Sequence, residues 1–251
     1  MKVYINNRNY LTWPKAIVDR MQREGHEVFI IDQNSSYEPL LDYYKTKPCE
    51  VIKLNGNYGH RSPWEMNVVD TSDFYVVTDP DLDLSHVPSD WEGVLREGLL
   101  RYGHSHGPKC GLSIKDTGIP KSSPMYSSDW NHGPKFCDHP DGLPQFWEKE
   151  LPGNFFAYPV DTTFALYAPG TSKHFDNGGV RSGKPYTAVH LPWHLVLDED
   201  LSDDSLQVVY DEEVHYYMKE ANSWSIPGVY ETCSTRGRIV EMINEYERRL
   251  K

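Results

Sequence analysis

The first third of this chain alternates two patterns of apolar residues. Short apolar segments with the composition of buried parallel strands cover residues 2–5, 27–32, 50–54 and 73–78. Between them, apolar residues recur at helical spacing, which predicts helices over residues 12–24, 37–45 and 62–72. A βαβαβαβ order is typical of a parallel sheet with helices on its faces, so the pattern predicts an α/β fold.

Residues near the ends of the first two predicted helices agree with this order. Pro14 falls in the first turn of the helix over residues 12–24, where the N–H that proline lacks is not needed. Gly25 follows the last turn of that helix and ends it. The Asn-Ser-Ser sequence at residues 34–36 predicts a turn that caps the helix over residues 37–45.

After the fourth predicted strand the pattern is less regular. Further ordered segments are predicted over residues 88–100 (helix), 110–114 (strand), 162–167 (strand), 189–197 and 235–250 (helix). Residues 101–145 are rich in Gly, Pro, His, Ser and Asp, which predicts a functional loop region within a single domain of 1–251. Residues 198–204 hold five acidic side chains and predict a solvated surface loop.

Charge and cysteine usage narrow the classes of function. The net charge is −12 and no basic run is visible, which disfavours a nucleic-acid binder because such proteins need a basic surface for phosphates. The four cysteines form no CxxC pair and are expected to be reduced thiols of a cytosolic protein. No apolar run is long enough to span a membrane and the start of the chain has no secretory pattern, so we expect a soluble, cytoplasmic protein.

Polar segments follow each of the four predicted strands of the first third. These segments are residues 6–9, 32–35, 55–60 and 79–81. In open parallel sheets, ligands bind beyond the carboxyl ends of the strands. The coincidence of four polar segments at such ends predicts a binding site along one edge of the sheet.

The fourth of these segments, Asp79-Pro80-Asp81, has the chemistry of a metal site. Mg²⁺ and Mn²⁺ prefer oxygen ligands and commonly bridge one or two carboxylates to the phosphates of a substrate. A cation held there would act as a Lewis acid towards a leaving diphosphate. The alternative is a turn or cap, where aspartate is common. The position at the end of the fourth strand favours the metal site.

Several stretches resemble GT-A glycosyltransferases close to family 2. They are VYINNRNYLTWPKAIVDRMQREGHEVFIIDQNSS, LNGNYGH and VVTDPDLD, which together cover about residues 1–90. Two later stretches, VDTTFALY and AVHLPWH, are similar to an acceptor-side strand and a histidine-bearing segment of some relatives. The resemblance implies a Rossmann-like, mostly parallel central sheet flanked by helices. Residues 1–100 would form the nucleotide-sugar-binding half, and residues 101–251 the acceptor-binding half with a C-terminal helix.

The same resemblance implies an activity and its partners. The activity is metal-dependent transfer of a sugar such as a hexose from a nucleotide sugar, with a UDP-sugar the first expectation and Mn²⁺ or Mg²⁺ the cofactor. The acceptor would be a hydroxyl of a glycan, a protein or a modified DNA base. The acidic charge of the chain makes DNA the least favoured of the three. Donor binding would fall to Asn6, Asn7, Arg8, Asp32, Asn55, His60 and Asp79.

Individual roles also follow from the resemblance. Asp32 would bond the nucleobase, Asp79 would meet the ribose or the metal, and Asp81 would hold the metal. His190 would be a third metal ligand, unless it is a histidine satisfied inside the fold, and His194 is its nearest rival.

Asp161 is the candidate general base for an inverting reaction, in which the acceptor hydroxyl must lose a proton. The alternative is an aspartate that begins a strand or turn. The Glu-Asp pair of family 2 is absent at the expected place, so the choice between inverting and retaining chemistry stays open.

Three other interpretations compete. A zinc site built from His104, His106, Cys110 and Cys137 lacks any familiar ligand spacing, which favours acceptor-loop residues instead. A sugar-nucleotide nucleotidyltransferase would need a Gly-rich, basic loop after the first strand, and NNRNYLTW has one Arg and no Gly. The third interpretation is a non-catalytic sugar-binding relative. The intact Asp79/Asp81 pair argues modestly against it.

Overall fold

A computed structural model describes residues 1–115, 117–124, 149–160, 163–173, 178–222 and 234–251. The chain divides into two compact units. The first comprises residues 1–115 and 145–189, and the second comprises residues 116–144 and 190–251. The expectation of a single domain stays a prediction.

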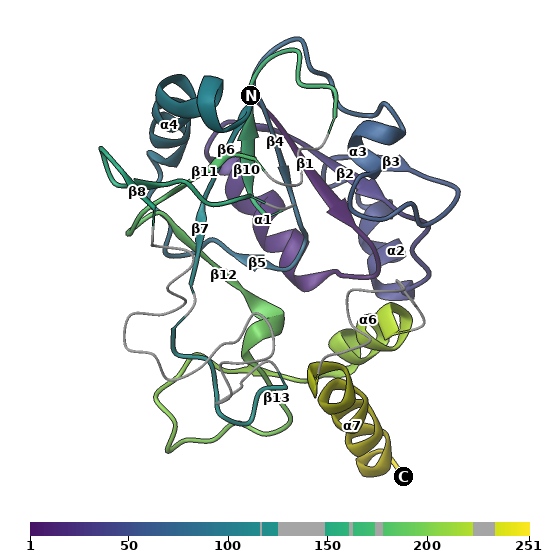
Figure 1. Ribbon diagram of the computed structural model, residues 1–251. Helices are drawn as coiled ribbons and strands as arrows, with labels where there is room; N and C mark the ends of the chain where they lie inside the picture. The colour runs from purple at the N-terminus through teal and green to yellow at the C-terminus, as the bar shows by residue number, and fades with distance from the viewer. Residues whose placement is uncertain (116, 125–148, 161–162, 174–177, 223–233) are drawn as a thin grey trace. The chain divides into compact units, whose positions relative to one another are not determined.

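The first unit is built on a mixed sheet of nine strands in the order β3-β2-β1-β4-β10-β6-β11-β9-β8 (Figure 1). Its parallel part consists of β1 (Lys2–Asn7), β2 (Glu27–Asp32), β3 (Glu50–Lys53) and β4 (Tyr75–Thr78). The other strands are β6 (Lys109–Gly111), β8 (Glu150–Leu151), β9 (Phe155–Phe156), β10 (Ala165–Tyr167) and β11 (Val180–Ser182). β10 runs antiparallel to β4 and β6, and β9 runs antiparallel to β11 and β8. The predicted α/β class is confirmed, with a sheet of mixed direction.

Helices flank this sheet. They are α1 (Thr12–Arg23), α2 (Glu38–Lys45), α3 (Ser62–Glu65) and α4 (Trp91–His106). α1 contacts β1 and β2, whereas α4 contacts β6, β10 and β11. A second, three-stranded sheet has the order β5-β12-β7, formed by β5 (Leu82–Asp83), β12 (Thr187–His190) and β7 (Ser113–Ile114). β5 begins directly after Asp81, so the Asp79-Pro80-Asp81 segment connects the two sheets.

Aromatic side chains fill the core beside the parallel strands. Tyr75 and Tyr167 stack with ring centroids 5.2 Å apart, and Tyr4 stacks on Phe29 at 4.9 Å. The indole N–H of Trp64 donates to the Tyr75 hydroxyl over 2.9 Å. A buried polar atom of an aromatic side chain needs a hydrogen-bond partner, and this bond provides one for the Trp64 indole and one for the Tyr75 hydroxyl.

The helix over residues 12–24 is confirmed, and Gly25, at φ +84°, follows it. The helix over residues 37–45 is also confirmed, but its expected cap is wrong. Tyr37 is the N-cap residue and makes no side-chain cap bond. Instead, the Asn9 amide oxygen accepts hydrogen bonds from the N–H groups of Ser36 and Tyr37, over 2.8 and 3.2 Å. The two residues just before the helix are therefore held by the loop after β1, a distant segment that local sequence does not reveal.

The predicted helix over residues 62–72 is wrong beyond Glu65. Asn67 adopts a left-handed conformation, with φ +52°, which ends the helical path. The N–H groups of Val68 and Val69 both bond to the carbonyl of Pro63. Apolar spacing alone suggested a longer helix, but the asparagine favours a turn and the two β-branched valines disfavour a helix.

The predicted loop over residues 101–145 is wrong for its first part. α4 continues to His106 and ends at Gly107, with φ +113°, and β6 follows. The predicted strand over residues 110–114 is divided into β6 and β7. Residues 116 and 125–145 of the predicted loop lie outside the described residues.

The second unit is smaller in its described part. It contains η1 (Leu191–His194), β13 (Leu195–Val196), β14 (Val208–Val209), α6 (Glu212–Asn222) and α7 (Ser234–Arg249). β13 pairs with β14 in parallel, and α6 contacts α7. The acidic segment over residues 198–204 is mostly exposed, as predicted. The Arg249 guanidinium lies 2.6 Å from the Asp198 carboxylate and attaches the end of α7 to this segment.

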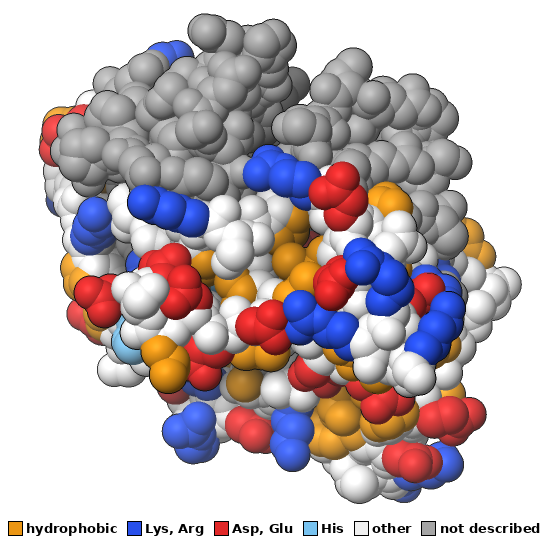
Figure 2. Space-filling view, turned by 90° about the horizontal axis from the view of Figure 1, so that it is seen from below, with side chains coloured by type: hydrophobic (Ala, Val, Ile, Leu, Met, Phe, Trp, Pro, Cys, Tyr) orange, Lys and Arg blue, Asp and Glu red, His pale blue; other side chains and the backbone are white. Residues whose placement is uncertain are grey.

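On the face that Figure 2 shows, Lys and Arg side chains are interspersed with Asp and Glu side chains. Phosphate binding along a nucleic acid needs a basic surface instead. None of the described helices is both long enough and apolar enough to cross a membrane.

Gly98 and Gly93 of α4 provide a test of the packing of this helix on the sheet. A Cβ at Gly98 would lie 2.5 Å from the Phe155 ring and 2.7 Å from the Cys110 sulfur, whereas a Cβ at Gly93 would meet nothing within 4 Å. Gly98→Ala is expected to cost about 2–3 kcal/mol by overpacking, which outweighs the gain of about 1 kcal/mol in helix propensity. Gly93→Ala should raise the free energy of unfolding by about 0.5–1 kcal/mol. Urea denaturation of both variants checks this, and equal effects would contradict the packing of α4.

Candidate functional site

The carboxyl ends of β1 to β4 lie at the same edge of the sheet. Asn7 pairs in register with Asp32, and Asp32 pairs with Lys53. On the other side of β1, Ile5 pairs with Thr78, the last residue of β4. The four polar segments that the sequence predicts at strand ends therefore leave the sheet together, as the rule for open parallel sheets requires.

A chain of hydrogen bonds joins the ends of β1 and β2. The Asn7 amide donates to the Tyr10 carbonyl over 2.8 Å and to the Tyr44 hydroxyl over 3.1 Å. That hydroxyl donates to one Asp32 oxygen over 3.1 Å, and the Ser35 N–H donates to the other over 3.2 Å. Burial, and then the Asp32 charge, raise the pKa of Tyr44, so its hydroxyl remains a donor at neutral pH.

Gln33 connects this chain of bonds to the loop after β3. Its amide nitrogen donates to the Asn6 side-chain oxygen over 2.8 Å and to the Gly59 carbonyl over 3.1 Å. Its amide oxygen accepts the Tyr58 N–H over 2.8 Å. The Ser62 hydroxyl also donates to Asn6, over 3.2 Å. One glutamine side chain therefore joins the ends of β1 and β2 to the loop over residues 54–61.

Asn9 completes the connection between the first two loops. Its backbone is left-handed, with φ +62°, a conformation that asparagine tolerates better than most residues. Its own N–H donates to the Ser35 hydroxyl over 2.9 Å, in addition to the two bonds that its side chain accepts at the start of α2. The loop after β1 is therefore held by its neighbour rather than open.

These side chains form a buried polar layer, which we call the strand-end network. Its members are Asn6, Asn7, Asn9, Asp32, Gln33 and Tyr44. All are buried, and Asp32 is only 2% exposed. Of the residues predicted to bind the donor, Asn6, Asn7 and Asp32 are brought together here. Asn9 and Gln33 lie in the predicted polar segments but were not singled out, and Tyr44 was not predicted, since the partners of all three lie far away in the sequence.

The other predicted donor-binding residues lie nearer the surface. Asn55 and His60 are exposed, and Arg8 is half-buried. Asn55 accepts a hydrogen bond from the hydroxyl of Tyr58, which is itself exposed. A ligand at this edge would meet these side chains before it met the strand-end network.

The aspartates after β4 differ in their surroundings. Asp79 is half-buried, and its backbone carbonyl accepts the Thr78 hydroxyl over 3.0 Å. Asp81 is 6% exposed. Asp83 forms a turn instead, because its two oxygens accept the N–H and hydroxyl of Ser85 over 2.7 and 3.0 Å. Asp83, two residues beyond the pair, therefore serves this turn.

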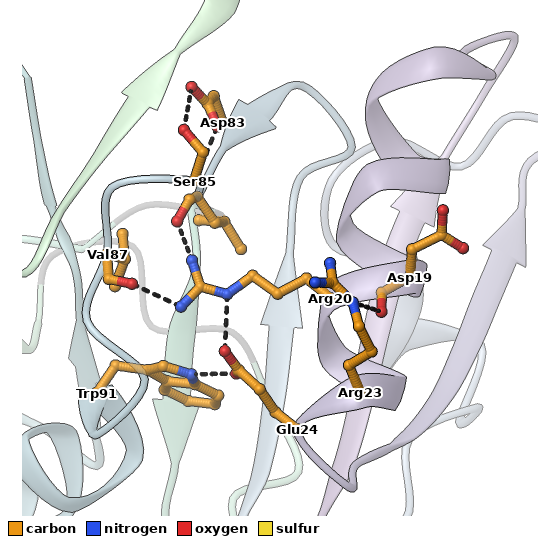
Figure 3. A network of polar contacts seen from close by, with 9 residues as sticks. Asp19, Arg20, Arg23, Glu24, Asp83, Ser85, Val87 and Trp91 are labelled. Carbon is orange, nitrogen blue, oxygen red and sulfur yellow. Dashed lines mark hydrogen bonds and ion pairs between the residues drawn. The ribbon is translucent and has the colours of Figure 1, made fainter.

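A network centred on Arg20 holds the segment that follows β5 (Figure 3). The guanidinium of Arg20, on α1, donates to the carbonyls of Leu84 and Val87, and to the Glu24 carboxylate over 2.9 Å. The second Glu24 oxygen accepts the indole N–H of Trp91 over 2.8 Å. Since α1 follows the loop after β1, one helix connects that loop with the segment just beyond Asp79-Pro80-Asp81.

Asp79 and Asp81 have the chemistry expected of a Mg²⁺ or Mn²⁺ site. Mg²⁺ is typically held by one or two carboxylates together with waters and substrate phosphates. Among the residues that the structure describes, no three His, Cys, Asp or Glu side chains gather as a metal-binding group. Two carboxylates are a number that such a cation commonly uses, with waters and substrate phosphates as its other ligands.

The two candidate histidines belong to the second unit. His190 lies at the start of η1, with its ring centroid 5.0 Å from that of Trp193. His194 is fully buried, and its Nδ1 lies 3.1 Å from the Leu206 carbonyl, so this ring is used inside its own unit. His190 as a metal ligand stays a prediction. Asp161, the candidate base, lies outside the described residues.

Three residues of the rival zinc interpretation lie in regular secondary structure. His104 and His106 are in the last turn of α4, and Cys110 is in β6 with no exposed surface. Burial raises the pKa of the Cys110 thiol, which disfavours the thiolate that a metal needs. The expectation of acceptor-loop residues is therefore wrong for these three positions, whereas Cys137 lies outside the described residues.

No model of a known protein family matches this chain, and no curated protein is detectably similar to it in sequence.

Removal of the Arg20 guanidinium should loosen the segment after β5. Arg20→Met leaves the Glu24 carboxylate and two carbonyls without this donor, at an expected cost of about 2–4 kcal/mol in the free energy of unfolding. A second change, Glu24→Gln, should restore part of that loss, because the isolated charge is gone. The exposed Arg23→Met on the same helix should stay within about 0.5 kcal/mol of the wild type. Chemical denaturation measures all three, and equal losses in Arg20→Met and Arg23→Met would contradict the network.

The centroids of the His26 and Trp91 rings are 5.2 Å apart. Burial of the His26 ring lowers the pKa of this histidine below 6.5. The folded state therefore favours the neutral ring, and the stability present above pH 6.5 is lost as the pH falls towards the folded pKa. His26→Asn should lose less stability than the wild type between pH 7 and pH 5. An NMR titration of His26 with a midpoint above 6.5 would contradict this prediction.

Proposed function

We propose that this protein is a metal-dependent glycosyltransferase of the GT-A type, which binds a nucleotide-sugar donor across the carboxyl ends of β3, β2, β1 and β4. One observation carries the proposal. The polar segments after four parallel strands meet at one edge, in register, and the last of them is Asp79-Pro80-Asp81. The Arg20 network supports it, because it holds the segment beyond this acidic pair.

The residues at this edge divide between the two ends of a nucleotide sugar. Asp79 and Asp81 would hold Mn²⁺ or Mg²⁺ beside the phosphates. A cation in this position neutralises the charge of the leaving diphosphate. Arg8, Asn55 and His60 are accessible at the same edge and would contact the nucleoside of a UDP-sugar. The buried strand-end network would support these contacts from beneath.

The transfer forms a bond between the acceptor oxygen and the anomeric carbon, and it breaks the bond from that carbon to the diphosphate oxygen. In an inverting reaction, Asp161 would take the proton of the acceptor hydroxyl. The acceptor is a glycan or a protein hydroxyl in preference to a modified DNA base, given the net charge of −12.

A nucleotidyltransferase on the same fold is supported less well. Such an enzyme would bind a triphosphate through backbone N–H groups of the loop after the first strand. Here the Asn9 N–H already donates to Ser35, and the Asn9 side chain is bonded to the start of α2. This loop is therefore built to hold α2 rather than to surround phosphates.

Nucleotide binding tests the proposal. In a thermal-shift screen of UDP, GDP, dTDP and CMP with and without Mn²⁺, at least one nucleotide should stabilise the protein only when the metal is present. At about 100 times its dissociation constant, a ligand adds about 2.7 kcal/mol to the free energy of unfolding. Asp81→Asn should remove the dependence on Mn²⁺.

Asp83→Asn is the matched control, because Asp83 lies two residues further on and its carboxylate is used in a turn. It should retain the Mn²⁺ effect. If no nucleotide stabilises the wild type with Mn²⁺, the donor-site proposal fails. Transfer or hydrolysis of a panel of sugar nucleotides would then separate a catalyst from a non-catalytic relative.

A further inference from the structure

Tyr58 is an exposed aromatic side chain whose position is fixed at both ends. It is 42% exposed, its N–H donates to the Gln33 amide oxygen over 2.8 Å, and its hydroxyl donates to Asn55. The ring lies close to Gly56, where an added Cβ would be 3.4 Å from three of its side-chain atoms. An exposed tyrosine normally has rotamer freedom to lose on binding, and this one has already lost much of it.

The loop that carries Tyr58 is attached to the strand-end network. The carbonyl of Gly59 accepts the amide N–H groups of Asn6 and Gln33, over 3.4 and 3.1 Å. Gly59 has φ +77°, a conformation that suits glycine, and its N–H donates to Asn57. The position of the Tyr58 ring is therefore determined by the ends of β1 and β2.

Asp32, by contrast, is turned inward. Both of its oxygens accept hydrogen bonds from the protein, one from Tyr44 and one from Ser35, and the residue is 2% exposed. A nucleobase N–H would reach this carboxylate only by displacing those groups. Asp32 is therefore suited to orienting Tyr44 and the loop after β2 rather than to reading a base.

The spacing of the strands relates Tyr58 to the acidic pair. The loop of Tyr58 follows β3, and Asp79 follows β4, with β2 and β1 between them. Three strand spacings amount to about 14 Å. An extended nucleoside diphosphate can bridge such a distance, with its base at one end and its metal-bound phosphates at the other.

We propose that the nucleobase of the donor stacks on the Tyr58 ring, and that stacking, not hydrogen bonding to Asp32, supplies most of the base contact. The inference rests on the proposed function, since it assigns the base end of the same site. Stacking on an aromatic ring tolerates any base, because every base has a π-face. The site therefore discriminates weakly between uracil and guanine nucleotides.

Calorimetry with UDP, GDP and pyrophosphate, each with Mn²⁺, tests the assignment. Tyr58→Ala should weaken UDP and GDP alike by about 5- to 150-fold, the range that loss of one stacking contact produces. Tyr58→Phe should retain most of the affinity, because the ring remains. Pyrophosphate has no base, so its affinity should be unchanged in Tyr58→Ala. A variant that merely disturbed the fold would weaken pyrophosphate as well.

Two further variants complete the test. Met66→Ala removes another exposed apolar side chain, 37% exposed just after α3, and should change no affinity. Asp32→Asn should lower the melting temperature but leave the ratio of UDP to GDP affinity unchanged.

The assignment is overturned if Tyr58→Ala binds UDP and GDP as the wild type does, or if folded Asp32→Asn loses UDP selectively. Either result would leave the proposed function standing, because the wild type still binds nucleotides. Failure of the wild type to bind any nucleotide with Mn²⁺ would instead overturn the proposed function, and this assignment with it.

Discussion

The hydrogen bonds of the Gln33 side chain hold together the edge of the sheet on which the candidate site depends. This amide bonds to Asn6 at the end of β1 and to Tyr58 and Gly59 after β3, although these residues lie 25 or more positions away in the sequence. Buried amides must satisfy both their donors and their acceptor, so the geometry of all three segments is set together. A change at Gln33 would therefore alter the surface of the loop over residues 54–61 as well as the interior.

The Arg20 network complements this edge from the other side of β1. α1 begins just after the loop that contains Asn9, and two turns later its Arg20 bonds to the carbonyls of Leu84 and Val87. The Asp79-Pro80-Asp81 segment thus lies between strand β4 and a following segment that Arg20 holds in place. Such preorganisation lowers the ordering cost of binding, which would favour the charged diphosphate and cation of the proposed function.

Prediction from sequence succeeded where the signal is local. The apolar periodicity located β1 to β4, α1 and α7, because burial on one face imposes that periodicity directly. It failed at residues 66–72, where Asn67 turns the chain, and at the end of α4, where Gly and His residues suggested a loop but continue a helix to His106. The first failure has a local cause, because Val68 and Val69 bond to the Pro63 carbonyl, whereas α4 is packed against the distant strands β6, β10 and β11.

The sequence alone determined which strands form the parallel part of the sheet and which polar residues follow them, since both depend on the order of residues along the chain. Only the tertiary structure decided which of those polar side chains face inward. Asp32 and Asn55 both follow a parallel strand, so the sequence predicts either as a binding residue. In the structure, Tyr44 and Ser35 donate to the buried Asp32 carboxylate, whereas Asn55 is exposed and bonded to Tyr58. The physical reason is that a buried polar group needs partners, and those partners come from segments that meet only when the sheet has formed.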